Sequence, residues 1–130
     1  MAPLPHVEPP KIDIAALEAA AAADPRDADI RLRLGWAFLS SDRLDRAAGA
    51  FQEARRLLPD DPEPYFALGL THKKEGRSAE AVAAFHDAAE RTSHLQDKAR
   101  AAILRRLSLG HINYLERGEW DLEREVWGRA

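Results

Sequence analysis

The chain has 130 residues, of which 45% are hydrophobic and 32% are charged, and its formal net charge is −3. This length and balance suit one soluble, helix-rich globular domain and argue against wholesale disorder. The absence of cysteine excludes disulfides and thiolate chemistry, and a slightly acidic chain has no cationic bias toward nucleic acid.

No apolar run approaches the ~20 residues that a membrane-spanning helix needs. Residues 1–10 also lack the basic start and the apolar stretch of a signal peptide. We therefore expect a cytoplasmic protein without membrane insertion.

The expected elements begin with an arm over residues 1–10, where four prolines favour a flexible or polyproline conformation. From Lys11 onward helices are favoured, because Ala and Leu are abundant and β-branched and aromatic residues are scarce. The expected helices cover residues 11–23, 28–40, 44–57, 62–75, 78–91, 96–117 and 119–127. Asp61 is an expected N-cap with Pro62 at the first helical position, and Gly76 is an expected C-cap.

A period of 34 residues relates the two middle helix pairs. Leu34 and Gly35 recur as Leu68 and Gly69. In the second helix of each pair, Ala47, Phe51 and Ala54 recur as Ala81, Phe85 and Ala88. Small residues at these positions let two helices approach closely, and the phenylalanines then fill the gaps between successive hairpins.

At these residues the sequence resembles the tetratricopeptide repeat (TPR) family, whose unit of 34 residues is a helix–turn–helix. The resemblance covers repeat 1 at residues 28–61 and repeat 2 at residues 62–95. It implies an all-α fold, a right-handed α-α superhelix of stacked antiparallel hairpins with capping helices. Two residues depart from the family pattern: Arg31 stands where a large aromatic is usual, and Ser93 replaces the terminal proline.

The flanking segments are expected to cap this array, because two repeats alone would expose apolar surface at both ends. We interpret residues 11–23 as a lone second helix docked on the first hairpin; the alternative is a loosely helical linker. Downstream, Leu109–Gly110 echoes Leu68–Gly69 at an offset of 41. Residues 96–127 therefore read as a divergent third hairpin, which completes a single domain over 11–127.

The register of the last expected helix, residues 119–127, is left open by the sequence. The offset of 41 puts Leu122 and Val126 in the core, whereas one residue more puts Trp120 and Trp127 there. All four side chains are large and apolar, so we expect most of them to face protein.

The motifs of common enzyme classes are absent, including phosphate-binding glycine loops, the HExxH zinc motif and the GxSxG nucleophile motif. The five histidines form no close pair with metal-ligand spacing, although residues from neighbouring hairpins could still meet in space. Short basic runs are flanked by acids, which is typical of solvated helix faces. We therefore expect no enzyme activity, no cofactor, no metal site and no nucleic-acid partner.

In the TPR family, the first helix of each hairpin lines a concave groove. The resemblance therefore implies an apolar strip with one cation as the partner-binding site: Leu32, Trp36, Leu39, Phe66, Leu70 and Lys73. His111 and Tyr114 would extend it in the third segment. Some family members grip a peptide's terminal carboxylate in this groove; here Leu32, Trp36 and Ala67 occupy the matching places, so that carboxylate clamp is missing.

Exposed apolar clusters often mark contact sites, and tryptophan is enriched in binding hot spots. The sequence therefore predicts an adaptor or scaffold that binds an apolar peptide or helix of a protein partner. The alternative is a structural assembly unit that packs through its helices into a homo-oligomer or larger complex. A further alternative leaves the groove filled by the chain itself, with Trp36 packed inside or one of the termini lying in it.

Overall fold

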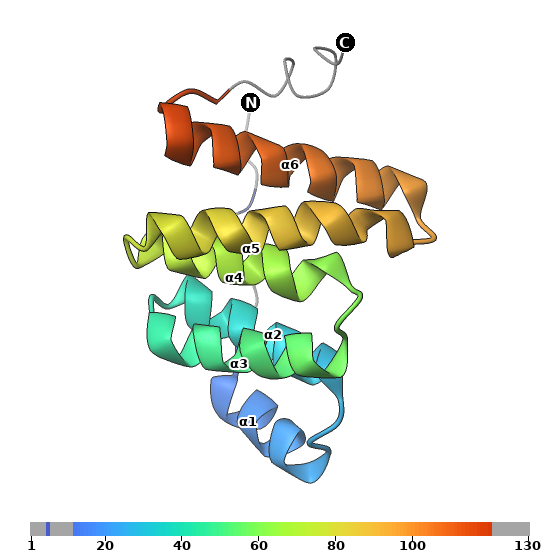
Figure 1. The fold of residues 1–130 in the computed structure, drawn as a ribbon. Helices are drawn as coiled ribbons and strands as arrows, with labels where there is room; N and C mark the ends of the chain where they lie inside the picture. The colour runs from blue at the N-terminus through green and yellow to red at the C-terminus, as the bar shows by residue number, and fades with distance from the viewer. Residues whose placement is uncertain (1–4, 6–11, 121–130) are drawn as a thin grey trace.

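The computed structural model describes residue 5 and residues 12–120 of the chain. Within these residues the helices are α1 (Ile14–Ala23), α2 (Ala28–Ser40), α3 (Leu44–Leu57), α4 (Pro62–Lys74), α5 (Ser78–Arg91), the short 3-10 helix η1 (Thr92–His94) and α6 (Lys98–Arg117). The described part of the chain contains no β-strand. Figure 1 shows the helices stacked in chain order from α1 to α6. The all-α fold of stacked helix hairpins that the sequence predicts is confirmed.

Aspartate side chains begin four of the helices. Asp13, Asp27, Asp61 and Asp97 each accept a hydrogen bond from a backbone N–H in the first turn, at 3.0, 3.2, 2.9 and 3.0 Å. Such a bond satisfies a donor that the helix itself leaves unpaired. The predicted N-cap at Asp61 is therefore confirmed. Helices α1 and α6 begin at residues 14 and 98 rather than at the expected 11 and 96, because Asp13 and Asp97 cap them there.

The turns inside the two repeats have the same backbone conformation at equivalent positions. Asp42 ends the α2–α3 turn region with φ 58°, and Gly76, 34 residues later, has φ 77° between α4 and α5. The left-handed conformation is free for glycine and tolerated by aspartate. Helix α4 ends at Lys74 with Glu75 as its C-cap, so Gly76 is the residue after the cap rather than the expected C-cap, and it carries the left-handed turn that follows the helix.

The repeated small residues mark places where helices touch. Phe51 and Phe85 are fully buried, as are the alanines of the series, Ala47, Ala54, Ala81 and Ala88. A Cβ built on Gly35 would lie 2.5 Å from Phe51 Cε1, and one built on Gly69 would lie 2.6 Å from Phe85 Cε1. Each phenylalanine ring therefore lies directly on the glycine of the paired helix, which explains the Gly…Phe spacing.

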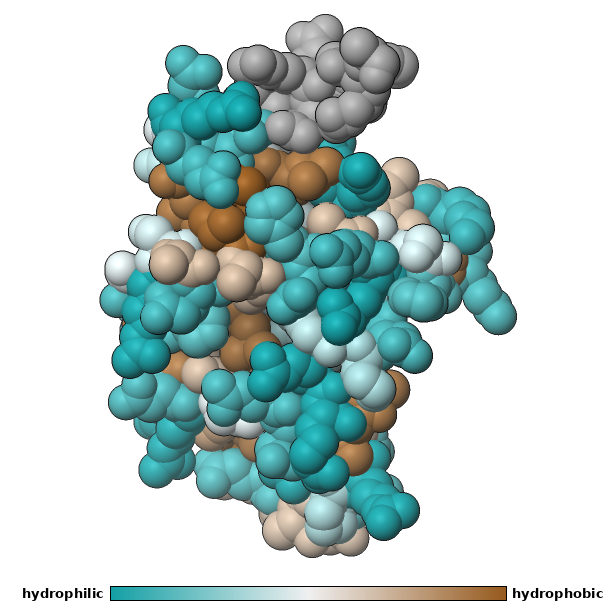
Figure 2. Space-filling view, viewed as in Figure 1, coloured by the Kyte–Doolittle hydropathy of each residue, from teal (hydrophilic) through white to brown (hydrophobic). Residues whose placement is uncertain are grey.

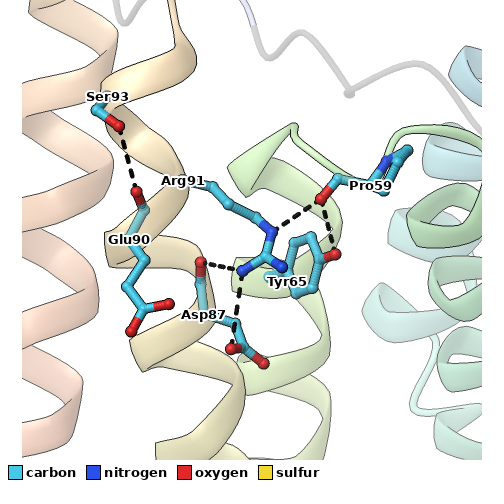
Figure 3. Close-up of polar contacts among 6 residues, drawn as sticks. All are labelled: Pro59, Tyr65, Asp87, Glu90, Arg91 and Ser93. Carbon is cyan, nitrogen blue, oxygen red and sulfur yellow. Dashed lines mark hydrogen bonds and ion pairs between the residues drawn. The ribbon is translucent and has the colours of Figure 1, made fainter.

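The second repeat is joined to the first by a polar cluster around the carbonyl of Pro59 (Figure 3). Tyr65 Oη and Arg91 Nε both donate to this oxygen, each at 2.8 Å. The guanidinium carbon of Arg91 also lies 4.0 Å from the centre of the Tyr65 ring. Because Tyr65 lies in the first turn of α4 and Arg91 is the last residue of α5, this cluster fixes both ends of the second hairpin to the turn that precedes it.

The flanking helices pack on the two repeats. Ala21 of α1 is buried in the cluster that holds Phe51, and Ile14 and Leu17 pack against that cluster. At the other end, α6 packs mainly on α5, and its Ile112 is buried in the same cluster as Phe85. None of the helices within residues 12–120 is long and apolar enough to cross a membrane.

The expected last helix, residues 119–127, mostly lies outside the described residues. Helix α6 ends at Arg117, its C-cap Gly118 has φ 75°, and Glu119 and Trp120 have no regular secondary structure. The two registers proposed for Leu122, Val126 and Trp127 stay untested, since these residues are not described. The arm expected at residues 1–10 also lies outside the described residues, apart from Pro5.

Candidate functional site

The candidate site is a pocket between α2 and α4, the first helices of the two repeats. It has a volume of about 560 Å³. Helix α2 contributes Trp36, Leu39 and Ser40, and α4 contributes Leu70, Lys73 and Lys74. The pocket therefore combines an apolar floor with two ammonium groups at one side.

Trp36 is placed at the centre of this face by the core beneath it. Its ring meets the Phe51 ring edge to face, with the centroids 5.2 Å apart, and its side chain packs against both hydrophobic clusters. The indole is half-buried, so one side is held by the repeat and the other faces the pocket. Such an aromatic is well suited to contact a partner, because it is already ordered before binding.

A second pocket of about 340 Å³ adjoins the first on the α1 side. Its lining includes Ile12 and Leu17 in addition to residues of α2. Trp36 and Ser40 line both pockets. The two pockets therefore meet at these residues and form one groove that runs from Ile12 to Lys73.

The groove resembles the expected apolar strip only in part. Of the six expected residues, the structure brings Trp36, Leu39, Leu70 and Lys73 together at the pocket. Leu32 and Phe66 do not line it and are only 7% and 8% exposed. Leu39 lines the pocket but is also only 6% exposed.

The expectation that Leu32, Leu39 and Phe66 are exposed in the groove is therefore wrong, although Leu39 still lines the pocket. Helices α2 and α4 lie between neighbouring helices, so side chains on several faces of each are covered at once. Phe66, for example, meets Phe85 edge to face with the ring centroids 5.6 Å apart. Whether any of the six residues binds a partner stays a prediction.

Three aromatic residues surround the Lys73 end of the groove. The ammonium nitrogen of Lys73 lies 3.1 Å from His111 Nδ1. It also lies 4.8 Å from the centre of the Tyr114 ring and 5.8 Å from that of Trp120. The sequence predicted that His111 and Tyr114 extend the groove, and the structure brings both to Lys73.

Sequence reasoning did not connect Trp120 with the groove. Its ring meets that of His111 edge to face, with the centroids 4.6 Å apart, and it is 42% exposed. Trp120 follows the left-handed turn at Gly118 and lies outside helix α6, so the register that put it in the core gave no indication of a contact with His111 at the groove.

His111 is neutral at physiological pH. Burial, and secondly the charge of Lys73, lower its pKa from 6.5 to about 4. The ring is stacked on that of Phe85, with the centroids 4.7 Å apart and the planes 5° from parallel. In the tautomer with the proton on Nε2, Nδ1 accepts a hydrogen bond from the Lys73 ammonium.

The positive charges near the groove differ in how they are compensated. Arg33 pairs with Asp29 at 2.9 Å, and Lys74 with Asp42 at 3.4 Å. Lys73 has no carboxylate partner among the described residues; its neighbours are the neutral His111 and aromatic rings. Lys73 is therefore the cation of the groove that is best placed to meet an acidic group of a ligand.

Within residues 12–120, no three His, Asp or Glu side chains gather closely enough to hold a metal ion. The half-buried pair of His72 Nδ1 and Glu75 Oε1, 3.0 Å apart, connects two residues of the same helix end. In the described part of the chain, the groove is thus the feature whose chemistry points to a ligand.

These features define a helical-hairpin repeat protein with a groove along the first helices of its repeats. Residues 14–62 match the family model described as tetratricopeptide repeat. This match bears out the resemblance to the tetratricopeptide repeat family that the 34-residue period predicts, over residues 14–62.

Two relatives each match about half of the chain. The chain is 39% identical over 62 residues to the peroxisomal targeting signal receptor of Candida glabrata, a match that covers 48% of this chain and 10% of the relative. It is 36% identical over 69 residues to the cell division cycle protein 27 homolog of Caenorhabditis elegans, covering 53% of this chain and 9% of the relative. The chain thus spans about a tenth of the length of the curated relatives it matches.

Proposed function

We propose that this chain is a protein–protein interaction adaptor that binds an apolar segment of a partner in the groove between α2 and α4. The observation that carries the proposal is the pocket lined by Trp36, Leu39, Leu70 and Lys73. A relative whose name is that of a receptor for a targeting signal supports recognition of a segment of another protein. The proposal assigns no catalytic role to any residue.

Each groove residue has a part in this proposal. Trp36 supplies a large preordered apolar surface, Leu70 continues it into the second repeat, and the mostly buried Leu39 completes the lining of the pocket. Lys73 supplies a cation that has no carboxylate partner among the described residues. Its neighbour His111 is neutral and accepts a hydrogen bond from the ammonium group. A bound segment would therefore place apolar side chains over Trp36 and Leu70, and a carboxylate beside Lys73.

The substitution Ser40→Arg tests the proposal without touching the core. Ser40 is exposed, lines both pockets and is the last residue of α2. A cation is favourable at a helix C-terminus, so the fold should keep its stability while the long side chain obstructs the groove. Gln52→Arg is the matched control, because Gln52 is exposed on α3 and lines neither pocket.

The measurement compares crosslinked partners of the wild type, the groove variant and the control. A groove-bound partner should be captured by the wild type and by Gln52→Arg, and its affinity for Ser40→Arg should be at least about tenfold weaker. Equal capture by all three would place the interaction on another face. If the chain instead self-associates through the groove, sedimentation will show the wild type and control as oligomers and Ser40→Arg as a monomer.

A further inference from the structure

Ile12 lies at the α1 end of the groove. This side chain is 58% exposed and lines the smaller pocket with Leu17, Arg33 and Trp36. Trp36 and Ser40 of α2 line both this pocket and the larger one, so the path from Ile12 toward Leu70 and Lys73 crosses the outer side of α2. The eleven residues that precede Ile12 are thus attached at one end of the groove.

Those eleven residues are long enough to follow the groove to its other end. An extended polyproline segment rises ~3.1 Å per residue, so eleven residues span ~34 Å. Helices α2 and α4 contact each other, as do α4 and α6. With packed helices 8–10 Å apart, the path from α2 to α6 is ~20 Å.

The composition of residues 1–11 fits the groove. Four prolines lower the entropy that an extended segment loses when it is held in place. Leu4 and Val7 can supply apolar side chains, and Glu8 is the carboxylate of this segment. Glu8 lies four residues before Ile12, ~12 Å along an extended segment, which is about the distance from one helix to the next and hence to the level of Lys73.

We propose that residues 1–11 of this chain are an internal occupant of the groove, which a partner segment must displace. This inference rests on the proposed function of the groove and adds its regulation. Partner segments then compete with residues 1–11 for the groove. A partner segment occupies the groove only if it binds strongly enough to displace the tethered residues. A partner segment of the same character, proline-containing and apolar with one acidic residue, would fit best.

A single nitroxide label tests the location of the segment in the full chain. The chain has no cysteine, so His6→Cys provides one attachment site. The label should broaden the backbone amide resonances of Leu70, Lys73 and Lys74, and spare Arg56 and His86, which are exposed on α3 and α5. Gln52→Cys, with the label on α3, is the matched control and should not broaden the groove residues selectively.

Two results would overturn the inference. One is broadening from His6→Cys that is uniform, weak or absent at the groove residues. The other is groove broadening in a mixture of isotope-labelled protein without nitroxide and nitroxide-labelled protein without isotope, because the occupant is then the segment of a second copy. Groove broadening only within the same molecule supports the inference.

Competition by a synthetic peptide of residues 1–11 provides the second test. A short tether gives an effective concentration on the order of 1 mM. If the free peptide binds an empty groove with a Kd of about 0.1 mM, the tethered segment should weaken its binding to the wild type about tenfold. The full-length variant Leu4→Gly/Val7→Gly should recover that factor, whereas the control Ala2→Gly should not. Equal affinity for all three proteins would refute the inference.

The two proposals can fail separately. Partner capture that is lost in Ser40→Arg, together with no groove broadening from His6→Cys, leaves the adaptor function standing and removes the internal occupant. If the label broadens the groove resonances but Ser40→Arg captures the partner as well as the wild type does, the groove is not the partner site. The proposal of an internal occupant then stands without the adaptor function.

Discussion

Replacing Gly69 with alanine tests the helix contact on which the second repeat depends. The new Cβ would lie 2.6, 2.7 and 2.8 Å from Cε1, Cδ1 and Cζ of Phe85. The ring cannot easily withdraw, because it is fully buried and is stacked on His111 with the centroids 4.7 Å apart. The helices α4 and α5 must therefore separate, or the ring must leave its position.

The expected loss follows from two opposing effects. Extra atoms in a well-packed core cost about 1–3 kcal/mol, and these contacts are roughly 1 Å shorter than the optimum of about 3.5–4.0 Å, which favours the upper end. Alanine in place of glycine inside a helix contributes about 1 kcal/mol in the other direction. The free energy of unfolding should therefore fall by about 2 kcal/mol, a large share of the 5–15 kcal/mol typical of a domain.

Gly49→Ala is the matched control. Gly49 lies within α3, is exposed, and a Cβ built on it meets no atom within 4 Å. The same substitution should therefore raise the free energy of unfolding by about 1 kcal/mol through helix propensity alone. The two alanine variants should then differ by about 3 kcal/mol, with opposite signs relative to the wild type.

Urea unfolding followed by far-UV circular dichroism measures both variants, with the slope m expected to stay constant. In a Phe85→Leu background the cost of Gly69→Ala should shrink, because the smaller side chain leaves room for the new methyl group. Stabilisation by Gly69→Ala similar to that by Gly49→Ala, or a cost that is the same with and without Phe85, would show that the new methyl group does not clash with the Phe85 ring.

Three further predictions concern the other contacts. Tyr65→Phe removes one of two donors to the Pro59 carbonyl, so urea unfolding should show a loss of about 0.5–1.5 kcal/mol; a loss above 3 kcal/mol would mean that Arg91 does not hold the carbonyl alone. The NMR titration of His111 should have its midpoint near a pKa of about 4, and the free energy of unfolding should fall as the pH drops from 6.5 to 4, since the unfolded chain takes up this proton first. His111→Gln should lack that part of the pH dependence, and an equal dependence in the variant would assign it to other groups. Trp120→Ala should raise the pKa of His111 toward its ordinary value by admitting water, and an unchanged midpoint would show that Trp120 does not shield the ring.

The repeat core could be predicted from the sequence because its spacing is imposed by contact. Only a glycine at position 35 or 69 leaves room for the ring of Phe51 or Phe85. The repeated Gly…Phe spacing therefore indicates which helices pack together. The start of α1 was missed by three residues, although Asp13 carried an N-cap signal that could have been recognised.

The candidate site was harder to predict, and the reason is geometric. Helix α4 buries Tyr65, Phe66, Ala67 and Leu68 in succession, so its sequence shows no apolar stripe that would distinguish the covered faces from the open one. Burial of Phe66 therefore depends on contacts with other helices, such as that with Phe85 of α5, which the sequence of α4 alone does not reveal. Trp120 likewise reaches the groove through a turn after α6, and a contact of that kind leaves no periodic signal.

The positions that face the groove are freer than the positions that set the fold. With offsets of 34 and then 41 residues, the place held by Leu39 in α2 is held by Lys73 in α4 and Tyr114 in α6, whereas the buried Ala and Phe of the two repeats are identical. Helix packing thus determines the residue type at the buried Ala and Phe positions. The residue type at the position of Leu39, Lys73 and Tyr114 can vary with the ligand that the groove binds.

Lys73→Leu, which copies Leu39 into the second repeat, makes this separation testable. It should change the free energy of unfolding by less than about 1 kcal/mol, because the ammonium group forms no ion pair within the described residues and its ring contacts are partly exposed. It should weaken binding of the peptide of residues 1–11 to the Leu4→Gly/Val7→Gly protein if Glu8 meets Lys73, whereas Lys74→Leu, which removes the charge already paired with Asp42, should have a smaller effect. Urea unfolding and peptide titration of the same proteins decide the matter. If Lys73→Leu lowers stability as much as Gly69→Ala does, the position belongs to the packing of the repeat, and the chemistry of the groove cannot vary independently of the fold.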